Sequence, residues 1–225
     1  MPIPANTIPF LIGSIVTLVV GIKSLQTYKK LKMPLSRHFA FTGFLAAAGL
    51  GINSIPFYFT SNPEVLRVTL TIGRLFLDLV GYWQIYLIWY LTWLRKYPLR
   101  YFVVPLALLG IIGFVDQAVY FMNSPVGVVD GMALYRFSEL AKYIHIISLT
   151  IVFVAGVVIG INALQQKQFR ARVRLLSVCI LYIFASMAII YTMYLQGYNI
   201  SWIFLLCSII AAGVFLSTTL IFRNR

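Results

Sequence analysis

Residues 95–100 read Arg-Lys-Tyr-Pro-Leu-Arg, and this short basic turn separates two long apolar stretches, near 67–94 and 101–123. A helix needs about 20 residues to cross the hydrocarbon core of a bilayer, and both stretches exceed that length. Basic residues between transmembrane helices stay on the cytoplasmic side when a polytopic chain inserts. The stretch therefore predicts two membrane-spanning helices that are joined by a cytoplasmic turn.

The same pattern extends outward from this turn to both ends of the chain. Fourteen of the eighteen Lys and Arg residues follow the first, third, fifth and seventh apolar stretches: Lys23, Lys29, Lys30, Lys32, Arg37, Arg95, Lys96, Arg100, Lys167, Arg170, Arg172, Arg174, Arg223 and Arg225. The alternate connections hold only Arg67 and Arg136. This alternation predicts an all-α, polytopic integral membrane protein with seven transmembrane helices, N-terminus out and C-terminus in. We expect the helices near 8–27, 38–60, 67–94, 101–123, 138–163, 174–196 and 201–222.

Composition agrees with a membrane protein. Hydrophobic residues make up 61% of the 225 positions and charged residues only 10%, whereas about a quarter of an average soluble domain is charged. The net charge of +13 is divided among four short segments, which favours contact with anionic membrane lipids over binding to nucleic acid. We expect one transmembrane domain over residues 1–225, located in the cytoplasmic (inner) membrane.

Polar residues within the predicted helices gather at one depth. Ionisable residues in the hydrocarbon are costly, so each is a functional candidate. Four or five helices carry polar groups in their outer part, the sixth helix through Tyr191, Tyr194 and Gln196, and this common depth predicts a pocket that is open to the outside. The candidate ligand-binding residues are Arg74, Asp78, Asp116, Lys142, His145, Asn53 and Gln117.

The spacing of these charges predicts two ion pairs. Arg74 and Asp78 are four residues apart and share a helix face. Their pair either neutralises two buried charges and fixes helix packing, or lets Arg74 bind an anionic group that Asp78 orients. Glu139 and Lys142, three residues apart, form a second and more structural pair near the interface. Asp116 has no basic residue on its own helix, so it needs Lys142, Arg74, water or a proton.

The sequence lacks the residues that several classes of function require. His38 is expected at the cytoplasmic entry of the second helix, in the interface, and His145 in the outer part of the fifth, so the two cannot jointly ligate a haem. The chain has no HExxH or CxxC motif and no Ser in a nucleophile elbow. We therefore expect no metal, no cofactor and no enzymatic activity. The last helix, 201–222, contains no Lys, which excludes a retinal Schiff base at the position that rhodopsins use.

One layout resembles a known family. Gly73-Arg74-Leu75, an aromatic-rich middle of the third helix, the basic turn at 95–100 and Pro105 early in the next helix are similar to the seven-transmembrane sensor regions of bacterial histidine kinases. The resemblance covers about a fifth of the chain. Those sensors continue into a cytoplasmic catalytic region, whereas this sequence stops at Arg225. The resemblance thus implies a sensor module alone, or a relative that binds a membrane protein partner.

Three functions follow from these patterns. The first is a non-enzymatic receptor-like or accessory membrane protein, whose outer pocket binds a small ligand or a partner segment. The second is a structural subunit of a larger membrane complex, although the small-residue ridge of Gly43, Ala47 and Gly51 favours packing inside the bundle. The third is a small transporter or proton carrier, which requires polar residues in both halves of the membrane. The inner half offers few, namely Gln84, Asn162 and Ser177.

Overall fold

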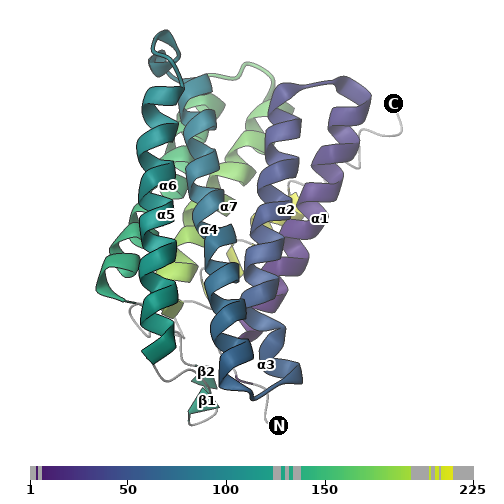
Figure 1. The fold of residues 1–225 in the computed structure, drawn as a ribbon. Coiled ribbons are helices and arrows are strands. Elements are labelled where there is room, and N and C mark those ends of the chain that lie inside the picture. The colour runs from purple at the N-terminus through teal and green to yellow at the C-terminus, as the bar shows by residue number, and fades with distance from the viewer. Residues whose placement is uncertain are drawn as a thin grey trace.

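The computed structural model describes residues 4, 7–123, 128–129, 132–133, 138–193, 203, 206–207 and 209–214. Long helices dominate and pack side by side as a bundle (Figure 1). In chain order, the elements are α1 (Ile8–Leu31), α2 (Pro34–Ser54), α3 (Pro56–Phe59), α4 (Pro63–Leu91), the 3-10 turn η2 (Trp93–Lys96), α5 (Arg100–Asn123), β1 (Val128–Val129), β2 (Met132–Ala133), α6 (Glu139–Leu164) and α7 (Phe169–Met193). The all-α prediction is confirmed for the described residues, apart from the two-residue antiparallel strands β1 and β2.

Short turns with defined caps make successive helices antiparallel. α1 ends at Lys32, whose φ of 54° lies in the left-handed region, and Pro34 then occupies the first turn of α2. Pro63 does the same for α4, where the Asn62 side chain accepts a hydrogen bond from the backbone N–H of Glu64 at 2.9 Å. Proline suits the first helical turn, because the backbone N–H groups of that turn have no acceptor within the helix and proline's lack of an N–H costs no hydrogen bond there.

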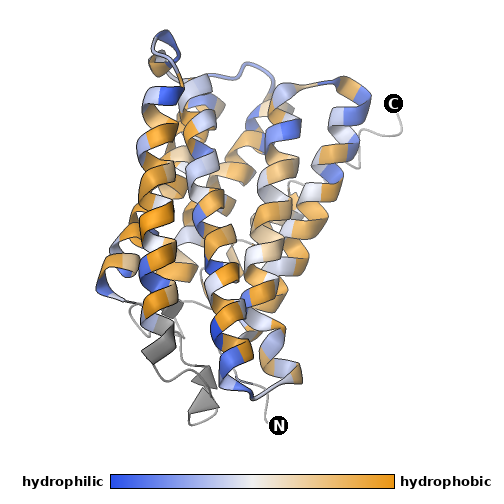
Figure 2. Ribbon diagram, in the orientation of Figure 1, coloured by the Kyte–Doolittle hydropathy of each residue, from blue (hydrophilic) through white to orange (hydrophobic). Residues whose placement is uncertain are grey.

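The basic turns lie together at one end of the bundle. In Figure 1 the turns after α1, α4 and α6 share one end, whereas α3, β1 and β2 lie at the other. We call the first the basic end, because Lys29, Lys30, Lys32, Arg95, Lys96 and Lys167 belong to it. Figure 2 shows that hydrophobic residues cover most of the helix lengths, with hydrophilic residues concentrated toward the helix ends. The side of the membrane that the basic end faces stays a prediction.

Five helices of the described chain are long and apolar enough to cross a membrane. They are Ile8–Leu31, Pro34–Phe59, Arg100–Tyr120, Glu139–Leu164 and Ala171–Ile190. These are compatible with a multi-pass membrane protein. The 29-residue α4 falls outside this set although it packs in the same bundle, because Arg74, Asp78 and its many Trp and Tyr residues lower its mean hydropathy. The predicted seventh span, 201–222, lies mostly outside the described residues.

Several predicted helices have different bounds in the structure. The first, expected over 8–27, extends to Leu31, and the sixth, expected over 174–196, spans Phe169–Met193. The second, expected over 38–60, begins at Pro34 and is followed by the separate short helix α3 after Ile55. The third, expected over 67–94, begins at Pro63 and stops at Leu91 before the tighter turn η2. Apolar length located these helices, whereas proline and capping residues determine where they begin and end.

Small residues of α2 form the surface that packs against α1. A Cβ added to Gly43 would lie 2.7 Å from the Cα of Gly21, so the two backbones touch here. One turn further, the carbonyl of Ala47 accepts a hydrogen bond from the Ser14 hydroxyl at 2.8 Å. A Cβ on Gly51 would lie 3.0 Å from that same hydroxyl oxygen. The ridge packs within the bundle, as its spacing favoured.

Candidate functional site

The predicted ion pair within α4 is present and buried. Arg74 Nε lies 3.5 Å from Asp78 Oδ2, and the two side chains are only 3% and 5% exposed. One helical turn separates the residues, so both side chains project from the same face of α4. At this burial the guanidinium and the carboxylate each need a partner, because an isolated charge in an apolar medium is very unfavourable.

His145 of α6 supplies a second partner for the same carboxylate. Its Nδ1 lies 2.6 Å from Asp78 Oδ1, and its side chain is fully buried. An ionised carboxylate only accepts hydrogen bonds, so Nδ1 of His145 donates in this contact. Each oxygen of Asp78 therefore has its own partner, one on α4 and one on α6. The short distance is typical of a hydrogen bond to a charged group.

Gln117 brings α5 into the cluster. Its side-chain Oε1 accepts a hydrogen bond from Arg74 Nη1 at 2.8 Å. The same oxygen accepts from the backbone N–H of Ser138, the residue before α6, at 3.3 Å. Gln117 is 1% exposed. One amide oxygen thus joins the cationic end of the ion pair to the start of α6. We refer to Arg74, Asp78, His145 and Gln117 as the charged cluster.

Close contact between α4 and α6 positions Asp78 against His145. The Ser148 hydroxyl donates to the backbone carbonyl of Asp78 at 3.1 Å. A Cβ added to Gly81 would lie 2.0 Å from that hydroxyl oxygen and 2.5 Å from the Ser148 carbonyl oxygen. Only glycine leaves room for this approach, so Gly81 sets the spacing between the two helices.

The remaining predicted site residues lie outside the charged cluster. Asn53 of α2 is buried against the backbone of α4, where a Cβ on Gly73 would meet its amide at 2.8 Å, and its Nδ2 donates to the Gly49 carbonyl at 2.9 Å. Lys142 pairs with Glu139 at 3.8 Å, and their side chains are 35% and 75% exposed. This second pair was also predicted.

Asp116 has a partner that its sequence context did not predict. Its Oδ2 accepts a hydrogen bond from the hydroxyl of Ser138. That hydroxyl also caps α6 by accepting from the backbone N–H of Ala141 at 3.1 Å. Asp116 is therefore tied to the start of α6 and not to Lys142 or Arg74. Among the seven predicted residues, the structure brings together Arg74, Asp78, His145 and Gln117.

A second buried polar group was missed because His38 was misplaced. We expected His38 in the interface, but it is 2% exposed between α2 and α4. Its Nε2 lies 3.0 Å from Gln84 Oε1, and Gln84 Nε2 donates to the Thr42 hydroxyl at 3.1 Å. The His38 ring stacks on Trp83 and Tyr86, with centroid distances of 5.6 and 5.7 Å. The i,i+4 spacing of His38 and Thr42 was the signal available in the sequence.

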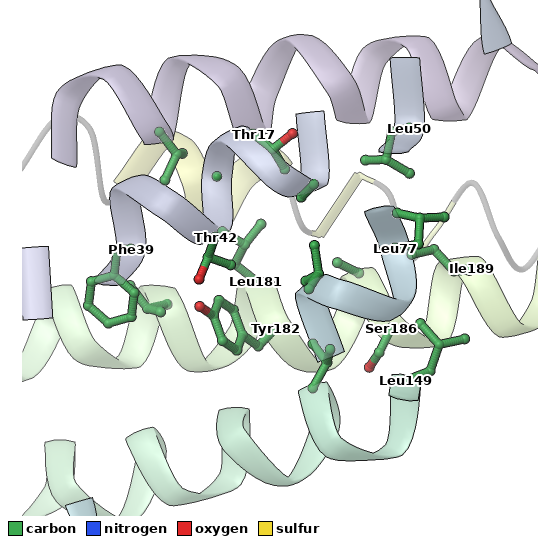
Figure 3. Close-up of a pocket in the computed structure, with 17 residues that line it drawn as sticks. Thr17, Phe39, Thr42, Leu50, Leu77, Leu149, Leu181, Tyr182, Ser186 and Ile189 are labelled. Carbon is green, nitrogen blue, oxygen red and sulfur yellow. The ribbon is translucent and has the colours of Figure 1, made fainter. Parts of the chain in front are cut away.

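A small cavity lies between α1, α2, α4, α6 and α7 (Figure 3). Its volume is about 90 Å³, and most of its wall is aliphatic. Four hydroxyl-bearing residues also line it: Thr17, Thr42, Tyr182 and Ser186. The hydroxyl of Tyr182 points toward that of Thr42 (Figure 3). Arg74, Asp78 and His145 are not among the residues that line it, so this central cavity differs from the pocket that the sequence predicted.

Within the described part of the chain, no three His, Cys, Asp or Glu residues are grouped so that they could hold a metal ion. No protein-family model, curated protein or solved structure matches the chain.

Proposed function

We propose that the protein is a non-enzymatic receptor-like or accessory membrane protein of the cytoplasmic membrane, and that its charged cluster responds to a small ligand or a partner segment. The observation that carries this proposal is the sharing of Asp78 between Arg74 and His145, with Gln117 as the link to a third helix. Buried ion pairs contribute little net stability compared with apolar packing, and ionisable residues inside a membrane are functional candidates by default.

The cluster extends from near the end of the bundle opposite the basic end to the middle of α4, since Asp78 lies fifteen residues after Pro63. Gln117 lies six residues before the end of α5 at Asn123, which is about 9 Å along a helix with a rise of 1.5 Å per residue. Ser138, which binds the same amide oxygen, directly precedes α6. A ligand that arrives from this end would meet Gln117 and Ser138 before Asp78.

Exchange of the hydrogen bond between Arg74 and Gln117 would change contacts among three helices, α4, α5 and α6. A carbonyl or carboxylate oxygen of a ligand accepts from Arg74 as the Gln117 oxygen does. Displacement of Gln117 would remove one hydrogen bond between α4 and α5 and one between α5 and the residue before α6, while Asp116 would still accept from the Ser138 hydroxyl. A ligand that binds the released arrangement more tightly shifts the population toward it. The movement of α5 and α6 relative to α4 is the proposed signal.

Native mass spectrometry of the protein purified in mild detergent tests this function. We expect a small molecule that is retained by the wild type, lost from Arg74→Lys and retained by Lys142→Gln. Gln117→Leu should bind it at least as tightly as the wild type, because the ligand then has no Gln117 oxygen to displace from Arg74. Arg74→Lys keeps the charge that Asp78 needs, and Lys142 serves as the control because its ion pair is outside the cluster. A stoichiometric protein partner that all variants retain would contradict the proposal and favour the alternative of a structural subunit in a membrane complex.

A small transporter or proton carrier is the second candidate, and one observation favours it. Such a protein needs polar groups in both halves of the membrane, and the group of His38, Gln84 and Thr42 provides them toward the basic end. Proteoliposomes with an internal pH dye test this function. Proton flux that is lost in both Asp78→Asn and Gln84→Leu, but kept in Lys142→Gln, would favour the carrier over the receptor.

A further inference from the structure

A second cavity lies at the basic end, between the α1–α2 hairpin and the first turns of α7. Its volume is about 280 Å³. Its polar lining comes from Ser24, Thr27, Ser36, Gln166 and Arg174. The cavity shares no residue with the charged cluster, so a ligand bound in it is independent of the proposed function.

The polar wall of this cavity is suited to an anion with several oxygens. Arg174 contributes a guanidinium whose Nε is buried. The Ser24 side chain is also buried, since the residue is 2% exposed, and its hydroxyl has no hydrogen-bond partner among the described residues. A buried hydroxyl without a partner is unfavourable, and a ligand oxygen would satisfy it. Arg174 offers a fork of N–H donors that matches a phosphate or carboxylate group.

The charge around the cavity also favours an anion. The helices that wall it, α1, α2 and α7, contain no Asp or Glu. Lys32 and Arg37 lie nearby in the α1–α2 turn and the start of α2. The Arg172 guanidinium donates to the Gln166 carbonyl at 2.8 Å and so fixes the turn that closes one wall. A group of basic residues on helices that contain no acidic residue raises the local concentration of anions.

The rest of the wall is apolar, which distinguishes the site from one for a free anion. It consists of Leu31, Met33, Leu35, Phe39, Ala171, Leu175 and Val178. Phe39 and Val178 also line the central cavity of Figure 3, so the two cavities are neighbours. A ligand that contacts both the polar wall and the apolar wall of the cavity at the basic end is an amphiphile with an anionic head.

We propose that this cavity binds the phosphate of an anionic phospholipid from the leaflet at the basic end. Arg174 pairs with a phosphate oxygen, the Ser24 hydroxyl donates to a second one, and an acyl chain lies along Phe39, Leu175 and Val178. A soluble phosphate ester would share the head-group contacts but would leave the apolar wall unfilled. Basic pockets between membrane helices are suited to such head groups.

Titration of the full chain in detergent, followed by native mass spectrometry, tests this site. The probes are phosphatidylglycerol, phosphatidylcholine with the same acyl chains, and glycerol 3-phosphate. We expect one phosphatidylglycerol to bind the wild type. Its Kd should rise about tenfold in Arg174→Gln and about threefold in Ser24→Ala, since each change removes hydrogen bonds to a charged group. Arg37→Gln is the matched control, because Arg37 is exposed at the same end but does not line the cavity.

Three results would overturn the lipid assignment. Equal weakening in Arg37→Gln and Arg174→Gln would mean general electrostatic attraction to this end. Equal affinity for phosphatidylcholine would mean that the anionic charge is not recognised. Competition by glycerol 3-phosphate at the lipid's own concentration would identify a soluble phosphate ester instead. If Arg174→Gln does not fold, Arg174→Lys and Ser24→Ala decide the outcome, since both keep the charge at this end.

Discussion

The two histidines are equally buried but have opposite surroundings. His145, between α4 and α6, contacts a carboxylate that also pairs with Arg74. His38, between α2 and α4, contacts the neutral amide of Gln84 and lies among aromatic rings. The comparison shows that burial alone does not define a site. The partner determines whether a histidine belongs to a group that carries charge or to one that only fixes packing.

The two groups should respond differently when one member is removed. Loss of a single charge from a buried ion pair leaves the other charge uncompensated, which is far more costly than the loss of a neutral hydrogen bond. Apolar replacement of a whole polar group can instead be nearly neutral, because no partner is left behind. Thermal and chemical unfolding in detergent micelles can measure this contrast.

Removal of the charge on Asp78 should have the largest effect. We expect Asp78→Asn to lower the free energy of unfolding by about 3–5 kcal/mol, because Arg74 then stays buried without a counter-charge. The double variant Arg74→Met/Asp78→Leu should recover only part of this loss, since it removes both charges but also removes the hydrogen-bond partners of His145 Nδ1 and Gln117 Oε1. A loss below about 1 kcal/mol in Asp78→Asn would show that water or another group already neutralises Arg74.

The spacing between α4 and α6 gives the next largest effect. Gly81→Ala should cost about 3 kcal/mol, at the upper end of the range for overpacking, because its methyl group would overlap the Ser148 hydroxyl and carbonyl. Gly213→Ala is the matched control, since a Cβ there meets no atom of the described residues within 4 Å. The His145–Asp78 contact should weaken with it. A similar stability for both variants would contradict the close packing that positions this contact.

The neutral group should be less sensitive. Gln84→Leu should cost about 2 kcal/mol, because it leaves His38 and the Thr42 hydroxyl buried without their partner. The double variant His38→Phe/Gln84→Leu should lie closer to wild type. If Gln84→Leu alone cost as much as Asp78→Asn, the group at the basic half would also have to carry a charge.

Local patterns predicted the part of the charged cluster that lies on one helix. Arg74 and Asp78 are one turn apart, so their contact follows from helical geometry alone. The contact of Asp78 with His145 depends on how α4 and α6 are rotated about their axes, and spacing along the chain indicates depth but not rotation. Gln117 was selected for the same depth, yet its link to Ser138 depends on where α6 begins.

The wrong expectations for His38 and Asp116 share one cause, which is where the helices begin. His38 was placed in the interface because the second helix was expected to start there, whereas Pro34 starts α2 one turn earlier. Asp116 was expected to need a cation or water, but Ser138 caps α6 and offers its hydroxyl. Apolar length reveals that a helix exists, while caps and prolines decide which side chains lie inside the bundle.

The smallest expected loss of stability concerns Lys142, which lies on α6 together with His145. Lys142 lies three residues before His145, but its side chain is 35% exposed and pairs with the 75% exposed Glu139 at 3.8 Å. Exposed ion pairs contribute about 0–1 kcal/mol and are screened by salt, so Lys142→Gln should lower the free energy of unfolding by less than about 0.5 kcal/mol. Unfolding at low and high salt measures both the loss and its screening. A loss as large as that of Gln84→Leu, and unchanged by salt, would place Lys142 in the charged cluster, where its depth in the sequence had predicted it.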